Sequence, residues 1–412
     1  MTIPRARLPR SPLADALHVA RCLALALWVA LAAPSIHAQT RGAFPDWHLT
    51  PLIENVVSPP RWFFGSDGRF HLVYELLLAN AMTLPATVGA VSVLDADSGA
   101  ILAHLSGPSL LAHMSFVATP DRPSVALPVA SVAAVWFDVS LADRADIPKA
   151  IAHRFTIEPI DGVPSSLLTF MGTRIAVDER PPVVLGPPLR GPQWDALGSC
   201  CDGPHRRALM PVNGGRYLAQ RFAIDFNKLD EQNRPGVGDP LAPTSFPTFG
   251  QPVIAVADAI VVVAVDRYPD LRVGATREEL TRESEGGNRV VLDLGSGRYA
   301  GYAHLQSGSL VVQPGERVRR GQPLAKAGSS GTTGGPHLHF QVMSGPSILF
   351  ADGLPFVFDR FVVSGQTPPL ADMLRYYDTL EAVPINIENA GPRRNALPLS
   401  GDVVTFPAGF SR

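Results

Sequence analysis

Two histidines at alternate positions lie in the stretch GGPHLHFQV, which runs from Gly334 to Val342. In a β-strand, side chains two positions apart project from the same face, so His337 and His339 would point together while Leu338 faces the core. Two adjacent imidazoles can bind a metal ion or move protons, although a pair of histidines on a solvated face would have the same pattern. An active site would need further imidazoles, brought in from separate strands.

The remaining histidines of the second half of the chain favour the active site. Beyond residue 153 the sequence has only His205, His304, His337 and His339. His304 lies in the strand-like stretch GYAHLQ, and both this stretch and GPHLHFQ follow glycine-rich turns. A region that is poor in histidine but concentrates imidazoles on such strands is typical of a catalytic centre rather than of a solvated surface.

The composition of the chain predicts an all-β protein. The 412 residues include 46% hydrophobic and 17% charged residues, enough for two or three domains with sizeable cores. The 40 prolines and 36 glycines indicate many turns and short strands rather than long helices. The net charge of −2, from 35 basic and 37 acidic residues, argues against a nucleic-acid-binding protein.

The first 38 residues are predicted to be a secretory signal peptide. Several arginines precede an apolar run from Cys22 to Ala33, and the small residue Ala38 offers a cleavage point. The run is shorter than the roughly 20 residues that a membrane-spanning helix needs, so an uncleaved anchor is the weaker alternative. We therefore expect a periplasmic or secreted protein with no stable membrane insertion after cleavage.

Two folded regions are expected after the signal peptide. Residues 40–165 alternate apolar and polar residues in short runs, which predicts a β-sandwich domain, Ig-like in type. The proline-rich residues 178–194 are predicted to be a semi-rigid linker. Residues 195–361 consist of short, glycine-bent strands that predict a compact antiparallel β-sheet domain. Residues 362–412 form a C-terminal tail for which the sequence suggests no role.

Five sequence stretches in the second region occur in a specific order. The stretch FAID is followed by GQPVIAVADAIVV, then by YAHL, and then by PGERVRRGQPLAKAGSSG and GPHLHFQV. In order and spacing they resemble the lysostaphin-like (LytM-type) zinc endopeptidases, a family that cuts peptide cross-links and stems of bacterial peptidoglycan. The resemblance covers about Gly203 to Val342, less than half of the chain.

The resemblance implies a Zn²⁺ ion that is held by a histidine, an aspartate and a second histidine, with water at the open position. By motif, Asp225 in AIDF and His339 are two of these metal ligands. His304 and His337 are the catalytic histidines that do not bind the metal. One would take a proton from the zinc-activated water, and the other would stabilise the oxyanion or protonate the leaving amine.

The chain departs from the family at the first motif, which is usually H-x-x-x-D. Arg221 stands four residues before Asp225, and a guanidinium has no lone pair for zinc. Either the third ligand comes from elsewhere, or the site is inactive. We assign Arg221 to substrate binding, through an anionic part of the substrate. A pairing with the second oxygen of Asp225 and a surface salt bridge are the alternatives.

His205 is the candidate for the missing third metal ligand. The segment from His205 to Asp225 is predicted to be a hairpin with its turn at Asn213–Gly215, which would bring His205 opposite Ala223 or Ile224. Either register places His205 near Asp225. The alternative is a histidine on the surface of a helix or loop.

The two cysteines that remain after signal cleavage are neighbours. Cys200 and Cys201 could form a vicinal disulfide in an oxidising compartment, or Cys201 and His205 could form a metal corner.

These residues together predict a zinc metalloendopeptidase that hydrolyses peptide bonds in peptidoglycan. One alternative is a catalytically inactive lysostaphin-like domain that binds cell wall or activates another hydrolase. A second alternative, a biotinyl or lipoyl carrier, fits the rhythm from Pro314 to Leu324, but Lys326 stands at the wrong place for an acceptor.

Overall fold

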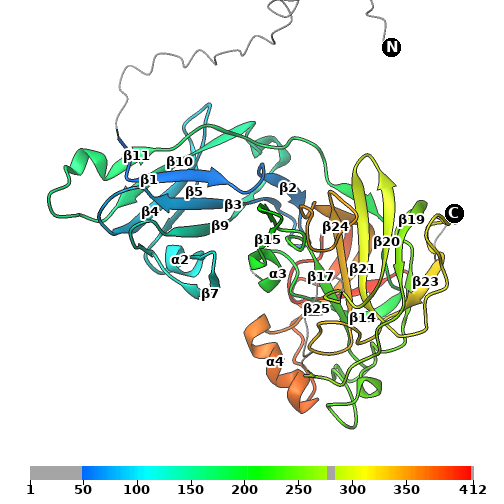
Figure 1. Cartoon of the computed structure of the whole chain (residues 1–412). Coiled ribbons are helices and arrows are strands. Elements are labelled where there is room, and N and C mark those ends of the chain that lie inside the picture. The colour runs from blue at the N-terminus through cyan, green and yellow to red at the C-terminus, as the bar shows by residue number, and fades with distance from the viewer. Residues whose placement is uncertain (1–48, 202, 276–283, 410–412) are drawn as a thin grey trace, which may run out of the picture. The chain divides into compact units, whose positions relative to one another are not determined.

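The computed structural model describes residues 49–201, 203–275 and 284–409. The predicted signal peptide at residues 1–38 lies outside these residues. Strands dominate the described chain, so the all-β prediction is confirmed (Figure 1). No described helix is both long enough and apolar enough to cross a membrane. The helical segments are short: α2 (Gly107–Ala112), α3 (Pro204–Arg207), α4 (Leu370–Thr379), and 3₁₀ turns at Arg144–Asp146, Ser165–Leu167 and Pro243–Ser245.

Two sheets form the first half of the described chain, and together we call them the N-terminal sheet pair. One sheet has the order β1-β3-β9-β6-β7 with β2 beside β3, and the other has the order β11-β10-β4-β5 with β8 and β12 at its margins. Their strands are β1 (Leu52–Val56), β2 (Arg61–Phe64), β3 (Phe70–Asn80), β4 (Ala86–Asp95), β5 (Ile101–Ser106), β6 (Met114–Phe116), β7 (Thr119–Pro123), β8 (Ala126–Leu127), β9 (Val132–Leu141), β10 (Ala150–Ile157), β11 (Thr169–Met171) and β12 (Ile175–Ala176).

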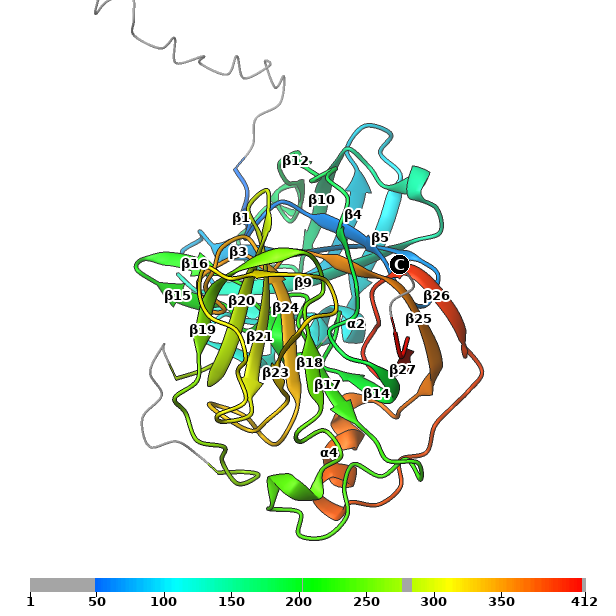
Figure 2. The same cartoon turned by 90° about the vertical axis from the view of Figure 1, so that its right-hand side faces the viewer.

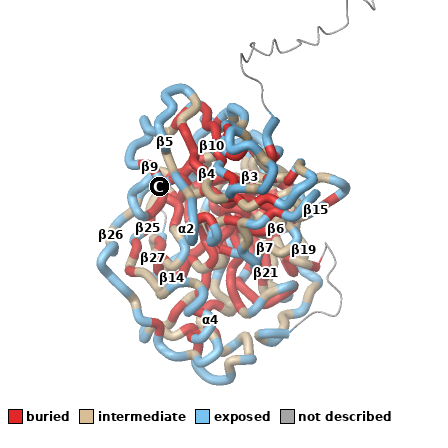
Figure 3. The backbone as a smooth tube through the Cα atoms, turned by 90° about the vertical axis from the view of Figure 1, so that its left-hand side faces the viewer, coloured by how far each residue is buried: buried red, intermediate tan, exposed pale blue. Residues whose placement is uncertain are grey.

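The two sheets share one apolar core, as a sandwich requires. Strand β3 is buried along almost its whole length, which explains why its sequence lacks a polar face (Figure 3). Leu72 and Tyr74 pack into the core of the sheet pair, whereas Val73 joins the core of the second half of the chain. Glu75 lies on the same face as Val73 and is completely buried. The Ig-like topology stays a prediction.

A mixed sheet of 11 described strands forms the second half. Its order is β13-β25-β27-β14-β17-β24-β21-β20-β19-β22, with β26 beside β25, and Figure 2 shows the strands from β17 to β19 side by side. All pairs are antiparallel except β13 with β25. The strands are β13 (Val183–Leu185), β14 (Gly191–Leu197), β17 (Ile224–Lys228), β19 (Ala259–Val265), β20 (Asn288–Gly295), β21 (Arg298–Leu305), β22 (Arg317–Val318), β24 (Leu338–Met343), β25 (Phe356–Gln366), β26 (Gly391–Ala396) and β27 (Asp402–Phe406), with small pairs β15 (Met210–Val212) and β16 (Gly215–Tyr217), and β18 (Pro252–Ile254) and β23 (Pro323–Lys326).

This sheet extends beyond the residues 195–361 expected for the second domain. The expected linker, 178–194, contains β13 and the start of β14, and the expected tail, 362–412, contains β26 and β27. Proline hid β14 from sequence reasoning, because Pro192 lies inside the strand. The register shifts between Gly191 and Trp194, so the proline falls where no ladder hydrogen bond is needed. The domain boundaries therefore stay a proposal.

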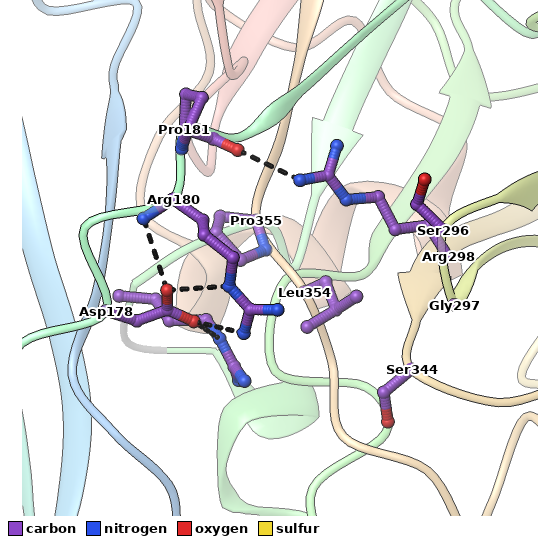
Figure 4. A pocket seen from close by; sticks show the side chains of 10 residues that line it. Asp178, Arg180, Pro181, Ser296, Gly297, Arg298, Ser344, Leu354 and Pro355 are labelled. Carbon is purple, nitrogen blue, oxygen red and sulfur yellow. Dashed lines mark hydrogen bonds and ion pairs between the residues drawn. The ribbon is translucent and has the colours of Figure 1, made fainter.

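The start of the expected linker is held by ion pairs. Asp178 accepts hydrogen bonds from Arg61 on β2 and from Arg180, at 3.1 and 2.7 Å (Figure 4). The hydrogen bond from Arg180, opposed by burial, lowers the pKa of Asp178. Arg298, at the start of β21, donates to the carbonyl of Pro181 across a cavity of about 90 Å³. These contacts fix residues 178–181 against strands of both halves.

Strand β14 also buries a carboxyl group that has no cation beside it. Asp195 is 0% exposed, its Oδ1 has no hydrogen-bond partner among the described residues, and its Oδ2 accepts a 3.5 Å hydrogen bond from Tyr377. Burial raises the pKa of Asp195 to about 7, a bond from Tyr377 opposes the rise, and the charge of Asp402 adds to it. Between pH 3.8 and about 7, the folded protein therefore keeps a proton on Asp195 that the unfolded chain releases.

We expect the contribution of Asp195 to the free energy of unfolding to be largest below pH 3.8. This contribution should fall as the pH rises from 3.8 to about 7. Asp195→Asn should flatten that part of the profile and be more stable than the wild type at pH 8, by on the order of 2 kcal/mol. Urea titrations from pH 4 to 8 measure this, with the exposed residue Asp121 changed to Asn as the control. Parallel profiles for Asp195→Asn and the wild type would contradict the expectation.

Candidate metal centre

The register of three neighbouring strands sets the centre. Asp225 on β17 lies directly opposite His339 on β24, and His339 lies opposite Ala303 on β21. Opposed residues of an antiparallel pair have their Cβ atoms about 5 Å apart, so these positions form a row across the middle of the sheet. His304 follows Ala303 at the end of β21, and His337 immediately precedes β24. Leu338, between the two histidines, is completely buried in the core, as predicted.

Three imidazoles contact the carboxylate of Asp225. His339 Nδ1 lies 2.8 Å from Oδ1, His337 Nε2 lies 3.3 Å from Oδ1, and His205 Nε2 lies 3.2 Å from Oδ2. The His304 ring is centred 4.7 Å from the His337 ring. The structure therefore brings together all five residues that the sequence singled out as ligands or catalytic histidines.

Each of the four imidazoles binds an oxygen atom through its other ring nitrogen. The Nδ1 atoms of His205, His304 and His337 bond to backbone carbonyls, and Nε2 of His339 bonds to a side-chain amide oxygen. These acceptors are the carbonyls of Gly198 at 3.0 Å, Ser330 at 2.8 Å and Gly335 at 2.9 Å, and Oε1 of Gln341 at 2.7 Å. A ring that donates one N–H to an oxygen presents a lone pair on the other nitrogen, which is how metal-binding histidines are oriented.

The donor set fits a divalent zinc ion. His205, Asp225 and His339 each offer a ligand atom, and these atoms all lie within 4.8 Å of one another. Two imidazoles and a carboxylate are the ligands of a common catalytic zinc site, which keeps a fourth position open. His304, His337 and His339 form a second group with the same spacing, so His339 belongs to both.

Charge is strongly coupled inside the centre. Burial lowers the pKa of His205 and His337, but the charge of Asp225 outweighs it and raises both pKa values. Burial raises the pKa of Asp225, and the charges of His205 and His337 overcome this and hold it well below its usual value. Burial, with the charges of His337 and His339, puts the pKa of His304 well below its usual value. The Asp225 carboxylate therefore favours positive charge in the centre, and a bound metal cation would supply such a charge.

His205 reaches the centre by a route that differs from the predicted hairpin. Strands β15 and β16 pair Val212 with Gly215, a register that the sequence did not predict, and His205 lies before them on helix α3. Pro204 occupies the first turn of this helix, where a missing N–H costs nothing. The closeness of His205 to Asp225 is found, but the strand pairing that predicted it was wrong.

Arg221 does not line the centre, which corrects its assignment to substrate binding. Its side chain is 2% exposed, and its NH2 group lies 2.6 Å from Oε2 of Glu75 on β3. Its Nε also donates to both Glu75 oxygens, at 2.8 and 3.1 Å. A guanidinium that is buried and bound in this way cannot meet a substrate. Glu75 was missed because nothing in the sequence marks one glutamate in an apolar strand as its partner.

His304 is held in an unusual backbone conformation. Its φ of 58° lies in the left-handed region, which non-glycine residues rarely adopt. The N–H of His304 donates to the carbonyl of Gly286, and its own carbonyl accepts from Gly328 N–H. The two hydrogen bonds hold the His304 backbone in this conformation.

The centre opens into a cavity of about 180 Å³. Besides the five residues, it is lined by polar groups that sequence reasoning did not select, namely Gln220, Glu285, Thr332 and Thr333. Thr333 lies 3.2 Å from Nδ1 of His337. The only signal for Thr332 and Thr333 was their position in the glycine-rich stretch before His337. The cavity leaves room for a small part of a substrate beside the histidines.

Cys200 and Cys201 form a disulfide bond with each other. A disulfide sulfur is not a thiolate, so the alternative metal corner of Cys201 and His205 is wrong. The vicinal disulfide that the sequence left open is present.

Comparisons with known proteins assign part of this region. Residues 244–347 match the model of peptidase family M23, a span that contains His304, His337 and His339 but not His205 or Asp225. A stretch of 101 residues, 24% of the chain, is 35% identical to the peptidoglycan DD-endopeptidase ShyB of Vibrio cholerae. The match spans about a fifth of that protein, 20% of its length.

Solved structures are similar at a lower level. The catalytic domain of lysostaphin from Staphylococcus simulans is 22% identical, with 38% of this chain and 84% of that chain covered at a TM-score of 0.22. A zinc-containing peptidase from Vibrio cholerae is 15% identical, with 68% and 81% covered at a TM-score of 0.23. By its residues 244–347, the chain carries a domain of peptidase family M23.

Proposed function

We propose that this protein is a zinc metalloendopeptidase that hydrolyses peptide bonds in bacterial peptidoglycan. The observation that carries the proposal is the convergence of His205, Asp225 and His339, with both imidazoles oriented by hydrogen bonds to their other nitrogens. The M23 match supports peptidase chemistry, and the similarity to the peptidoglycan DD-endopeptidase ShyB supports peptidoglycan as the substrate.

His205, Asp225 and His339 would hold the zinc ion. When bound, zinc supplies a Lewis acid that polarises a carbonyl and lowers the pKa of a water molecule towards about 7. Asp225 contributes the negative charge, and the bonds to Gly198 and Gln341 keep the two imidazoles directed at it.

His304 and His337 would carry the proton transfers. Both rings bond to carbonyls through Nδ1, so each presents Nε2 as the working nitrogen. One of these nitrogens accepts a proton from the attacking water, and the other stabilises the oxyanion or donates a proton to the leaving amine. The centres of the two rings lie 4.7 Å apart, the rings are tilted by 52° to each other, and both line the same cavity.

The inactive alternative is supported by Arg221, which stands where a ligand is expected. His205 argues against it, because it restores an imidazole at hydrogen-bonding distance from Asp225. A centre without a metal would gain nothing from three oriented imidazoles around one carboxylate.

We further propose that the protein works outside the cytoplasm, in the periplasm or as a secreted enzyme. The predicted signal peptide supports this, and so does the Cys200–Cys201 disulfide, because disulfides persist in oxidising compartments.

His205→Ala should lower zinc affinity by more than about 100-fold. Loss of an outer hydrogen-bonding partner already costs 10- to 100-fold, and loss of a ligand costs more. Competition with a chromogenic chelator measures the affinity, and His104→Ala, which changes an exposed histidine on β5 outside the centre, is the matched control. Zinc affinity that is unchanged in His205→Ala would refute its assignment as a ligand.

His304→Ala and His337→Ala should each reduce hydrolysis by at least about 100-fold, because each removes a general acid or base. Zinc should remain at about one ion per chain, since the three proposed ligands are untouched. Digestion of purified peptidoglycan, with the fragments identified by mass spectrometry, measures activity, and elemental analysis measures zinc. A wild-type protein that releases no peptide fragments would sink the proposed function.

A further inference from the structure

We propose that Glu75, on β3 of the N-terminal sheet pair, is a positioning residue of the metal centre and acts through Arg206 on His205. The N-terminal sheet pair would then be a structural part of the centre and not only an attached domain. This inference rests on the proposed function, because it takes His205 as a zinc ligand.

One buried carboxylate binds two buried guanidinium groups. Glu75 is 0% exposed, and Arg206 and Arg221 are each 2% exposed. Oε1 of Glu75 lies 3.4 Å from Nε of Arg206, and Oε2 lies 2.6 Å from NH2 of Arg221. Arg206 is the residue after His205, and Arg221 is four residues before Asp225. The segment that carries His205 and the segment that carries Asp225 are thus both bound to the side chain of Glu75.

Arg206 is fixed by backbone carbonyls as well. Its NH2 group donates to the carbonyls of Tyr74 on β3, at 3.1 Å, and of Phe137 on β9, while NH1 donates to Cys201 at 2.6 Å. Burial lowers the pKa of Arg206, and the charge of Glu75 opposes this and favours the charged form. Two of the three carbonyls belong to the N-terminal sheet pair, so α3 is anchored mainly from that side.

Arg207 adds a second anchor on the same side. Its NH1 and NH2 groups donate to the carbonyls of Pro120 and Ala112, at 3.1 and 3.0 Å. Its guanidinium lies 6.0 Å from the centre of the Trp136 ring on β9. His205 is therefore followed by Arg206 and Arg207, which both donate hydrogen bonds to backbone carbonyls of the N-terminal sheet pair.

Helix α3 needs this external support. It comprises only Pro204–Arg207, and so short a helix is unstable by itself because nucleation is unfavourable. Without the charge of Glu75, Arg206 and Arg221 would lose the carboxylate that contacts both of them, and the charge of Asp138 would still act on Arg206. Two buried guanidinium groups would then share less negative charge than they carry, which drives at least one of them towards solvent. Movement of Arg206 carries α3 with it and removes the His205 ring from Asp225.

Glu75→Gln, which keeps the volume and removes the charge, tests this. We expect zinc affinity to fall at least 10-fold in the full-length protein, measured by chelator competition at a pH where the variant keeps its near-ultraviolet circular dichroism. Glu54→Gln is the matched control, because Glu54 on β1 pairs with buried His153 at 3.0 Å inside the same sheet pair and does not touch α3. This control should bind zinc like the wild type.

A double-mutant cycle separates positioning from general destabilisation. If Glu75 acts through His205, Glu75→Gln should weaken zinc binding in the wild type but cause no further loss in the His205→Ala background. An equal loss in both backgrounds would overturn the inference, and so would an unchanged affinity in Glu75→Gln alone.

A second variant covers the case in which Glu75→Gln does not fold. Arg207→Ala removes the more accessible anchor, and we expect it to weaken zinc binding at least 3-fold, again only when His205 is present. Zinc affinity equal to that of the wild type would overturn the inference. A wild-type protein that binds no zinc would overturn the proposed function as well, whereas loss confined to His205→Ala leaves that function standing.

Discussion

The carboxylate of Asp225 imposes the constraint on which the second half of the chain depends. It lies in the middle of an 11-stranded sheet, opposite His339, where a negative charge needs compensation. Three imidazoles contact it directly, and each is oriented by a hydrogen bond on its far side. Sheet register supplies His339, which lies on the adjacent strand β24, and His337 immediately precedes that strand. His205 is the exception, because no strand of this sheet carries it.

The exception accompanies the departure of this chain from the H-x-x-x-D motif of the family that it resembles. Arg221 stands where a histidine would be expected, but it turns away from Asp225 and binds Glu75. The same glutamate binds Arg206, next to His205. The arginine at the motif position and the proposed ligand His205 are thus linked through a single buried anion. The linkage would make the family's common ligand set dispensable here, provided that the N-terminal sheet pair is present.

Sequence reasoning could predict the features that depend on local pattern. The alternation in GPHLHFQV placed two imidazoles on one face and Leu338 in the core, and the glycine and proline content indicated an all-β fold. The first of these features rests on periodicity within a few residues, and the second rests on composition. The sequence displays both directly.

Features that depend on distant contacts could not be predicted. The start of strand β14 was taken as linker because residues 178–194 are rich in proline, and only the register shift between Gly191 and Trp194 reveals why the strand tolerates Pro192. The predicted pairing of His205 was wrong because residues 204–207 form helix α3, whereas they were assigned to a strand of the hairpin. The partner of Arg221 lies 146 positions away on β3, and nothing local marks such a pairing.

Zinc-edge anomalous diffraction from crystals of the metal-loaded protein tests the central claim most directly. The account predicts one peak, within bonding distance of His205 Nε2, His339 Nδ1 and a carboxylate oxygen of Asp225. A peak bound by His304, His337 and His339 instead, with His205 turned away, would contradict it.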